Sequence, residues 1–153
     1  MTTAFFRIAI VDEKTGRGIP LARVQLNRYT DYWTDSAGMI AFLEPDLMGK
    51  RVHIHVQSAG YHLPIKPEEY EQRRKGDLSG MEIYPAAGGS VTIALRRDMI
   101  AERLYRITGS DIYRDSKMLG DATPPTRDET GSLVTGQDTV DMIPYKGKYF
   151  WLW

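Results

Sequence analysis

Three histidines in this sequence have the spacing of a possible metal site. His53 and His55 alternate along a stretch that reads as a β-strand, so both rings project from one face, and His62 follows at a turn. Imidazoles placed in this way are suitable zinc ligands. The alternative, which we favour, is an outward-facing strand surface, because no Asp or Glu is evidently placed to orient the rings.

One carboxylate suggests a second chemistry. Hydrolysis of a glycosidic bond requires two carboxyl groups placed across that bond. Asp138 could supply one of them in a longer chain, whereas its neighbour Asp141 would project to the opposite strand face. The simpler interpretation is that both residues lie in a turn and accept hydrogen bonds from backbone N–H groups.

Three further aspartates could gather oxygen ligands for a calcium ion. They are Asp111, Asp115 and Asp121, separated by four and six residues in an irregular segment. An EF-hand loop has ligands at alternate positions, so this spacing does not match one. Pairing with Arg106 or Arg114, together with turn formation, is the better explanation.

An aromatic cluster is the best candidate for ligand binding. Tyr29, Tyr32 and Trp33 lie in residues 28–33, a segment that we expect to connect two strands. Aromatic rings on a loop can stack on sugar rings, because they combine an apolar face with a polar tip. They can equally cover the end of a sandwich or pack against a neighbouring domain, and packing is the default interpretation.

The composition excludes several other kinds of chemistry. The 153 residues include 20 Lys and Arg against 20 Asp and Glu, so bulk charge predicts no nucleic-acid partner. Without cysteine there is no disulfide, thiolate nucleophile or cysteine-based zinc site. No Ser-His-Asp order, phosphate-binding glycine loop or nucleophile elbow is found, and no cofactor is predicted. The start of the sequence has no signal-peptide pattern, and no apolar run approaches membrane-spanning length.

Short strands must position these side chains. Apolar and polar residues alternate in 6–11, 24–27, 51–57 and 90–96. Glycine-containing turns separate the strands, and this spacing favours an all-β sandwich over alternating strands and helices. In 51–57 we expect Val52, Ile54 and Val56 to face the core, opposite the histidines.

The remaining segments are less regular. A surface helix is predicted from Pro67 to the capping Gly76. Residues 100–107 could form a short strand, and 108–136 is rich in Gly, Asp, Thr and Pro with little periodicity. Such a long irregular stretch indicates a linker or a segment that wraps a partner surface.

The last residues predict a β-hairpin. A tight turn at 145–148 separates two strands, the second with Tyr149, Trp151 and Trp153 on one face and Phe150 and Leu152 on the other. A strand that is apolar on both faces is normally covered on both sides. The aromatic strand could therefore bind a protein partner, for instance by adding a strand to another sheet.

Several motifs resemble the carboxypeptidase regulatory-like, or transthyretin-like, β-sandwich. They are the segment 10–26 with its Thr-Gly and Pro-Leu-Ala, the turn Thr-Asp-Ser-Ala-Gly at 34–38, Ala41-Phe42, and Ala-Gly-Tyr at 59–61. The resemblance covers about the first two thirds of the chain and carries no catalytic residues. It implies an accessory domain of a secreted or surface protein, with a stabilising, spacing or binding role.

The rest of the chain resembles a junction in uncharacterised bacterial proteins, where such a sandwich precedes a β-propeller similar to those of five-bladed glycoside hydrolases. The residues that carry this resemblance are 101–109, 112–116, 136–140 and 145–151. It implies that Asp138 corresponds to an aspartate of an early blade strand. Since a propeller needs several blades, residues 137–153 would be only the first strands of one.

The sequence therefore predicts a transthyretin-like or Ig-like antiparallel β-sandwich over 1–97, an extended linker over 98–136 and a β-hairpin over 137–153. The expected function is that of a non-catalytic accessory or interaction module of a bacterial carbohydrate-active protein. A full-length protein of this kind would be secreted or periplasmic. The alternatives are an N-terminal fragment of a glycoside hydrolase, with Asp138 contributing to its site, or a structural module that binds a partner protein or a downstream propeller through the aromatic strand.

Overall fold

The structure is a computed structural model of the whole chain. It describes residues 4–26, 30–65, 80–104, 106, 111–125 and 141–152. The chain divides into two compact units, the first formed by residues 1–105 and 113–123 and the second by residues 106–112 and 124–153.

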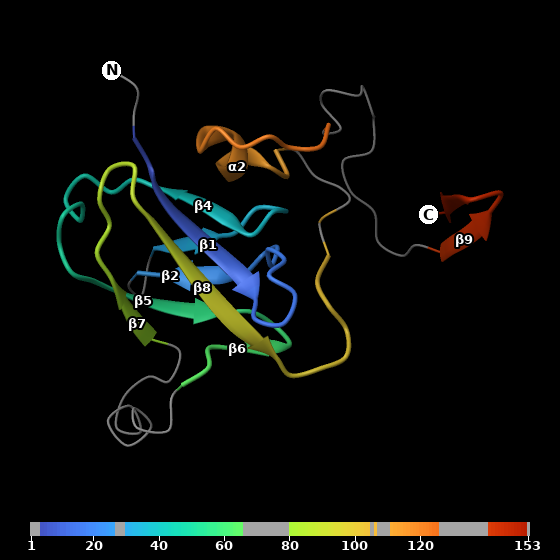
Figure 1. The fold of residues 1–153 in the computed structure, drawn as a ribbon, viewed down its shortest axis with the longest axis horizontal. Coiled ribbons are helices and arrows are strands. Elements are labelled where there is room, and N and C mark those ends of the chain that lie inside the picture. Colours follow the sequence, from blue (N-terminus) through green and yellow to red (C-terminus); the bar gives the residue numbers. More distant parts are fainter. Residues whose placement is uncertain are drawn as a thin grey trace. The chain divides into compact units, whose positions relative to one another are not determined.

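The described strands of the first unit form two four-stranded sheets (Figure 1). The β1 sheet has the spatial order β4 (Met39–Phe42), β1 (Phe6–Asp12), β8 (Ser90–Arg97) and β6 (Tyr61–His62). The β2 sheet has the order β3 (Asp31–Trp33), β2 (Arg23–Gln25), β5 (Val52–Gln57) and β7 (Gly80–Ile83). The all-β sandwich predicted from the sequence is confirmed.

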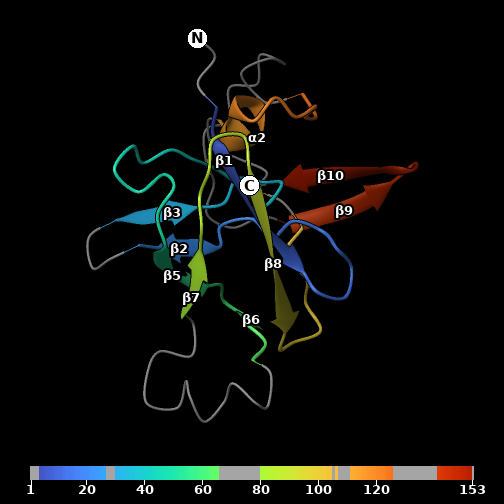
Figure 2. The same cartoon turned by 60° about the vertical axis from the view of Figure 1, so that its left-hand side comes forward.

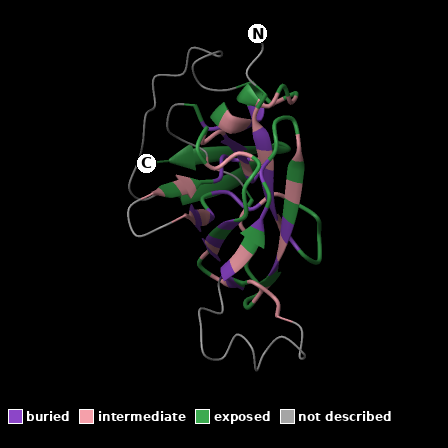
Figure 3. Ribbon diagram, turned by 90° about the vertical axis from the view of Figure 1, so that its left-hand side faces the viewer, coloured by how far each residue is buried: buried purple, intermediate pink, exposed green. Residues whose placement is uncertain are grey.

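The two sheets lie against each other (Figure 2), and side chains of both form one hydrophobic core. Strand β5 shows how the sequence produces this core, because Val52, Ile54 and Val56 are buried while His53 and Gln57 are exposed. Figure 3 shows the same alternation of buried and exposed positions along the strands. The core also includes Phe6, Ile8, Ile10, Val24, Ile40, Phe42, Ile93 and Leu95.

One strand pairing in the first unit is parallel. β1 pairs with β8 in parallel, with Ile8 opposite Val91 and Ile10 opposite Ile93, whereas the other pairings of named strands are antiparallel. The chain between these two strands therefore crosses to the β2 sheet and returns. As a result, β1 and β8, which are far apart in sequence, lie side by side in the centre of their sheet.

A close approach of two backbone segments explains two glycines of the first turns. Gly38 has φ of +78°, and a Cβ atom on it would lie 2.5 Å from the carbonyl oxygen of Ile10. A Cβ atom on Gly18 would lie 1.8 Å from the carbonyl oxygen of Ala37. The carboxylate of Asp35 holds this turn by accepting the N–H groups of Ala37 at 2.9 Å and Met39 at 3.1 Å. At Gly38 only glycine allows both the backbone angle and the contact, and at Gly18 the contact alone leaves no room for a side chain.

A short helix that the sequence did not predict packs on the first unit. It is α2 (Arg114–Met118), and two aspartates attach it to β4 and the preceding turn. The N–H of Ser116 donates to Asp35 at 2.7 Å, and Asp115 accepts the N–H of Ala41 at 2.8 Å. Residues 113–123, predicted as part of the linker 98–136, thus belong to the same compact unit as the sandwich.

The structure differs from the sequence interpretation at two further points of this region. One is the possible strand over 100–107, and the other is the pairing of the aspartates with Arg106 or Arg114. Residues 101–104 form no strand, whereas the sequence of 100–107 is compatible with a short strand. Asp121 forms a two-fold contact with the guanidinium of Arg7, at 2.6 and 2.8 Å. Asp115 and Asp121 therefore act as anchors for the segment around α2.

Residues 141–152 of the second unit form a β-hairpin. It consists of β9 (Asp141–Tyr145) and β10 (Lys148–Leu152), paired antiparallel with Tyr145 opposite Lys148. Lys146 and Gly147 both have positive φ, of 48° and 71°, as a type I′ turn requires. The predicted terminal hairpin and its turn are confirmed.

Some of the sequence predictions lie outside the described residues. They are the helix from Pro67 to Gly76 and the residues Tyr29, Asp138 and Trp153. In the described part of the chain, no helix combines the length and the apolar character needed to cross a membrane.

Candidate functional site

The two described residues of the predicted aromatic cluster do not lie on a loop. Tyr32 and Trp33 belong to the edge strand β3, and consecutive strand residues point to opposite faces. The half-buried Tyr32 ring packs against Phe42 at 5.5 Å between centroids, and its hydroxyl hydrogen-bonds to the Glu44 carboxylate. Burial, followed by that hydrogen bond, raises the pKa of Tyr32. Trp33 points outward and is 54% exposed, so only Trp33 of this pair is available to a ligand.

Trp33 belongs to a row of side chains on the outer face of the β2 sheet. Strand register places it opposite Arg23 of β2, which is in turn opposite Gln57 of β5. Arg23 pairs with Asp31 at 2.9 Å and reaches Gln57 at 3.5 Å. An aromatic face, a guanidinium and an amide thus follow one another across three strands.

A groove runs beside this row and forms the best candidate ligand site. It has a volume of about 680 Å³, and its lining consists of Leu21, Arg23, Trp33, residues 56–59, Tyr61 and Arg103. We call it the Trp33 groove. Its volume is within the range of about 300–1,000 Å³ typical of small-molecule sites, and it combines apolar walls with a few polar groups.

Arg103 reaches the groove from a segment without regular secondary structure. Its backbone N–H donates to the Tyr61 hydroxyl at 3.2 Å, and its Nη1 donates to the carbonyl oxygens of Pro20 at 3.1 Å and Leu21 at 3.3 Å. The sequence does not reveal Arg103 as a site residue, since it lies about 40 positions from Tyr61 and about 80 from Leu21, with no local pattern to connect them.

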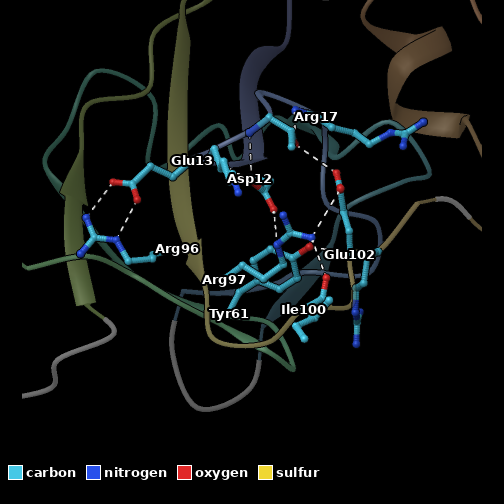
Figure 4. A network of polar contacts seen from close by, with 11 residues as sticks. Asp12, Glu13, Arg17, Tyr61, Arg96, Arg97, Ile100 and Glu102 are labelled. Carbon is cyan, nitrogen blue, oxygen red and sulfur yellow. Dashed lines mark hydrogen bonds and ion pairs between the residues drawn. The ribbon is translucent and has the colours of Figure 1, made fainter.

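A polar network at the end of β1 and β8 holds that segment in place (Figure 4). Arg97 contacts the carboxylates of Asp12 at 3.2 Å and Glu102 at 3.5 Å, and it donates to the carbonyl oxygen of Ile100 at 3.1 Å. Thr15 donates to Glu102 at 3.0 Å. Because Glu102 precedes Arg103, the network also positions the Arg103 side chain at the groove.

Asp12 is the buried centre of this network, with 1% of the residue exposed. Burial alone would raise the pKa of its carboxyl group, but the N–H groups of Thr15 and Lys14 and the charge of Arg97 outweigh it. The pKa of Asp12 is consequently lower than usual, and the group is a carboxylate at neutral pH. Asp12 and Arg97 therefore form an ion pair at neutral pH, with the Asp12 carboxylate buried.

A second cavity lies beside the network, and most of the charged side chains that line it are paired with another charged group. It has a volume of about 780 Å³ and is lined by residues 13–14 and 96–100. Glu13 binds Arg96 through two hydrogen bonds of 2.8 and 3.0 Å, and Asp98 contacts His62 at 2.5 Å. Among its described lining residues, this cavity lacks an exposed aromatic side chain, which the Trp33 groove has in Trp33.

The structure divides the three predicted zinc ligands between the two sheets. His53 and His55 share the outer face of β5, with ring centroids 4.9 Å apart, while His62 lies on β6 and contacts Asp98. Among the described residues, no group of three or more His, Cys, Asp or Glu is arranged to hold a metal ion.

No protein-family model matches the chain, and no curated protein is significantly similar to it. The fold and the site define an all-β sandwich domain with an aromatic and cationic groove on one sheet.

Proposed function

We propose that the chain is a non-catalytic accessory module that binds a saccharide in the Trp33 groove. Such a module would serve a bacterial carbohydrate-active protein that is secreted or periplasmic. The observation that carries the proposal is the exposed Trp33, in register with Arg23 and Gln57 beside a groove of suitable volume. The resemblance of the sequence to accessory sandwich domains supports the same function.

The chemistry of the groove suits a sugar ring. Trp33 presents a flat apolar surface to the C–H groups of a pyranose, and the ring hydroxyls need hydrogen-bond donors and acceptors at its edge. Arg23 and Gln57 supply these in the next two strands. Because they lie on paired strands, their positions are already set before a ligand arrives, which reduces the entropic cost of binding.

Binding to a panel of oligosaccharides tests the proposal. We expect Trp33→Ala to weaken binding at least tenfold, since an exposed aromatic anchor contributes about 1–2 kcal/mol or more. Tyr84→Ala is the matched control, because Tyr84 is 64% exposed and lies outside the groove lining. Absence of binding to every saccharide, or equal loss in both variants, would refute a sugar site at Trp33.

The enzyme alternative finds less support in the groove. Glycoside hydrolysis needs two carboxyl groups across the scissile bond, and none of the described residues that line the Trp33 groove is acidic. We expect no turnover of aryl glycosides by this chain. Turnover that is abolished by Asp138→Asn would instead favour the glycoside hydrolase interpretation.

A second candidate function is protein binding through the hairpin. Both of its faces carry exposed apolar side chains: Met142, Ile143, Tyr145, Tyr149, Phe150, Trp151 and Leu152. The exposed fraction ranges from 37% for Trp151 to 65% for Tyr149. A two-stranded hairpin cannot bury such side chains by itself, so an added surface would stabilise it.

The open edge of β10 supplies the backbone groups for such a partner. In a two-residue hairpin the pair next to the turn exchanges hydrogen bonds, and alternate pairs do not. Tyr149 opposite Pro144, and Trp151 opposite Met142, are the alternate pairs, so their backbone groups face outward. Pro144 lacks an N–H and weakens the β9 edge, whereas β10 has no proline. We propose that a partner strand adds to β10.

A further inference from the structure

The charge of the Trp33 groove restricts the kind of saccharide it would bind. Two arginines, Arg23 and Arg103, are among its described lining residues, and no aspartate or glutamate is. Asp31, outside the lining, pairs with Arg23 at 2.9 Å and balances its charge. In the part of the chain that the structure describes, Arg103 has no carboxylate partner, so the groove has one uncompensated cation.

The hydrogen bonds of Arg103 leave a defined set of donors. Its Nη1 is occupied by the carbonyl oxygens of Pro20 and Leu21, which hold the guanidinium against the loop before β2. Its Nη2 and Nε donate to no acceptor among the described residues. These two nitrogens form the side of a guanidinium that binds a carboxylate through two parallel hydrogen bonds.

The overall charge of the molecule does not supply a preference for anionic ligands. The formal net charge is zero, with 20 basic and 20 acidic residues, so no long-range field draws anions to the chain. Selection for an anion would then have to arise by direct contact, and would act only on a ligand that fits beside Trp33.

We propose that the Trp33 groove binds a uronic-acid saccharide, with one sugar ring stacked on Trp33 and its carboxylate on Nη2 and Nε of Arg103. This inference rests on the proposed saccharide-binding function and names the class of sugar. A planar carboxylate attached to a pyranose satisfies both the aromatic surface and the guanidinium, whereas a neutral hexose leaves the guanidinium without an anionic partner.

The test compares trisaccharides of galacturonic, glucuronic and mannuronic acid with their methyl esters, which keep the ring but lose the charge. Titration calorimetry on the full chain should give at least one free acid that binds roughly tenfold tighter than its ester. Arg103→Gln should remove this difference, because the amide keeps a donor for the backbone carbonyls without the charge. Arg51→Gln is the control, since Arg51 is exposed and paired with Glu82 away from the groove.

Each outcome separates the two proposals. If acids and esters bind equally and Trp33→Ala weakens both, the groove binds sugars but the preference for uronic acids is wrong. If Arg103→Gln weakens acid and ester by the same factor, Arg103 only shapes the groove, and the proposal is likewise overturned. If no trisaccharide, charged or neutral, binds to the chain, the uronic-acid proposal fails, and the oligosaccharide panel then decides whether the groove binds another sugar. Thermal unfolding of each variant verifies that it is folded.

Discussion

Neighbouring residues of the same chemical kind have different tasks in this protein. Tyr32 packs beneath its strand against Phe42, whereas Trp33 is exposed in the groove. Asp115 and Asp121, six positions apart, differ in a similar way. Asp115 lies partly buried beside the β4 backbone, and Asp121 pairs with the guanidinium of Arg7. The surroundings of each side chain, and not its type, decide its contribution to stability.

The two aspartates should give opposite pH dependences. Burial, followed by the proximity of Asp35, raises the pKa of Asp115, although the Ala41 N–H opposes this. The folded state then binds its proton more readily than the unfolded state, so its contribution to stability decreases as pH rises through the raised pKa. The hydrogen bond from Arg7 lowers the pKa of Asp121. Its stabilisation is present above the ordinary aspartate pKa and is lost as pH falls through the lowered one.

Urea unfolding of Asp115→Asn and Asp121→Asn from pH 2 to pH 7 measures these contributions. Asp121→Asn should lower the free energy of unfolding by about 0.5–1 kcal/mol at pH 7, as for a partly exposed ion pair, and by less at pH 2. The effect of Asp115→Asn on the free energy of unfolding should be more favourable at pH 7 than at pH 2, because at pH 7 the substitution removes a partly buried charge. The amide oxygen can still accept the Ala41 N–H. Parallel curves for the two variants would contradict the assigned environments.

Turns and edges decide how the elements of this protein fit together. The turn at 34–38 packs so closely on residues 10 and 18 that no side chain fits, and α2 covers the N–H of Ala41 on the edge strand β4. By contrast, the β10 edge is open among the described residues. Protected edges prevent association between sheets, so the open edge of β10 is available for pairing.

Substitution of Gly38 tests the close backbone approach at the turn 34–38. Gly38→Ala should lower the free energy of unfolding by about 3 kcal/mol or more, through the left-handed backbone angle and the clash together. Gly49→Ala is the matched control, because Gly49 has nearly the same φ, +75°, with no atom within 4 Å of an added Cβ. It should cost only about 1–2 kcal/mol. Equal losses in denaturant unfolding would show that packing at Gly38 is unimportant.

A second copy of the chain provides a direct probe of the β10 edge. Two β10 strands can pair antiparallel about Phe150, which places Tyr149 opposite Trp151 of the other copy. Sedimentation velocity should show self-association that increases with protein concentration. Tyr149→Pro removes the outward N–H and should abolish it, while Tyr149→Ala keeps that N–H and should only weaken it. A monomer at every concentration would count against an accessible edge.

At the scale of the whole molecule, residues beyond the last sandwich strand complete the first unit. Segment 98–104 is held by Arg97 and Tyr61, and segment 113–123 by Asp35, Ala41 and Arg7. A boundary at residue 97, as the sequence suggested, would remove these contacts and Arg103 with them. A boundary after residue 123 would keep them.

Truncated chains can distinguish these boundaries. A chain of residues 1–123 should unfold cooperatively and keep the saccharide affinity of the full chain. Removal of residues 98–123 as well should lower the free energy of unfolding by roughly 3–5 kcal/mol, given several lost hydrogen bonds of about 1 kcal/mol each. It should also abolish binding that depends on Arg103. Equal stability of the two chains would place the boundary at residue 97.

Features that depend on near neighbours in the chain could be predicted from the sequence alone. The two-residue alternation of 51–57 predicts which side chains of β5 are buried, and the Lys-Gly turn predicts the hairpin, because both follow from local backbone geometry. Strand β3 and helix α2, with three and five residues, are too short to show a period, so the sequence did not reveal them. Only the tertiary structure separated Tyr32 from Trp33 and placed Trp33, Arg23 and Arg103 around one groove. Strand register and hydrogen bonds between residues far apart in the chain create that site, and these are long-range interactions that no local pattern encodes.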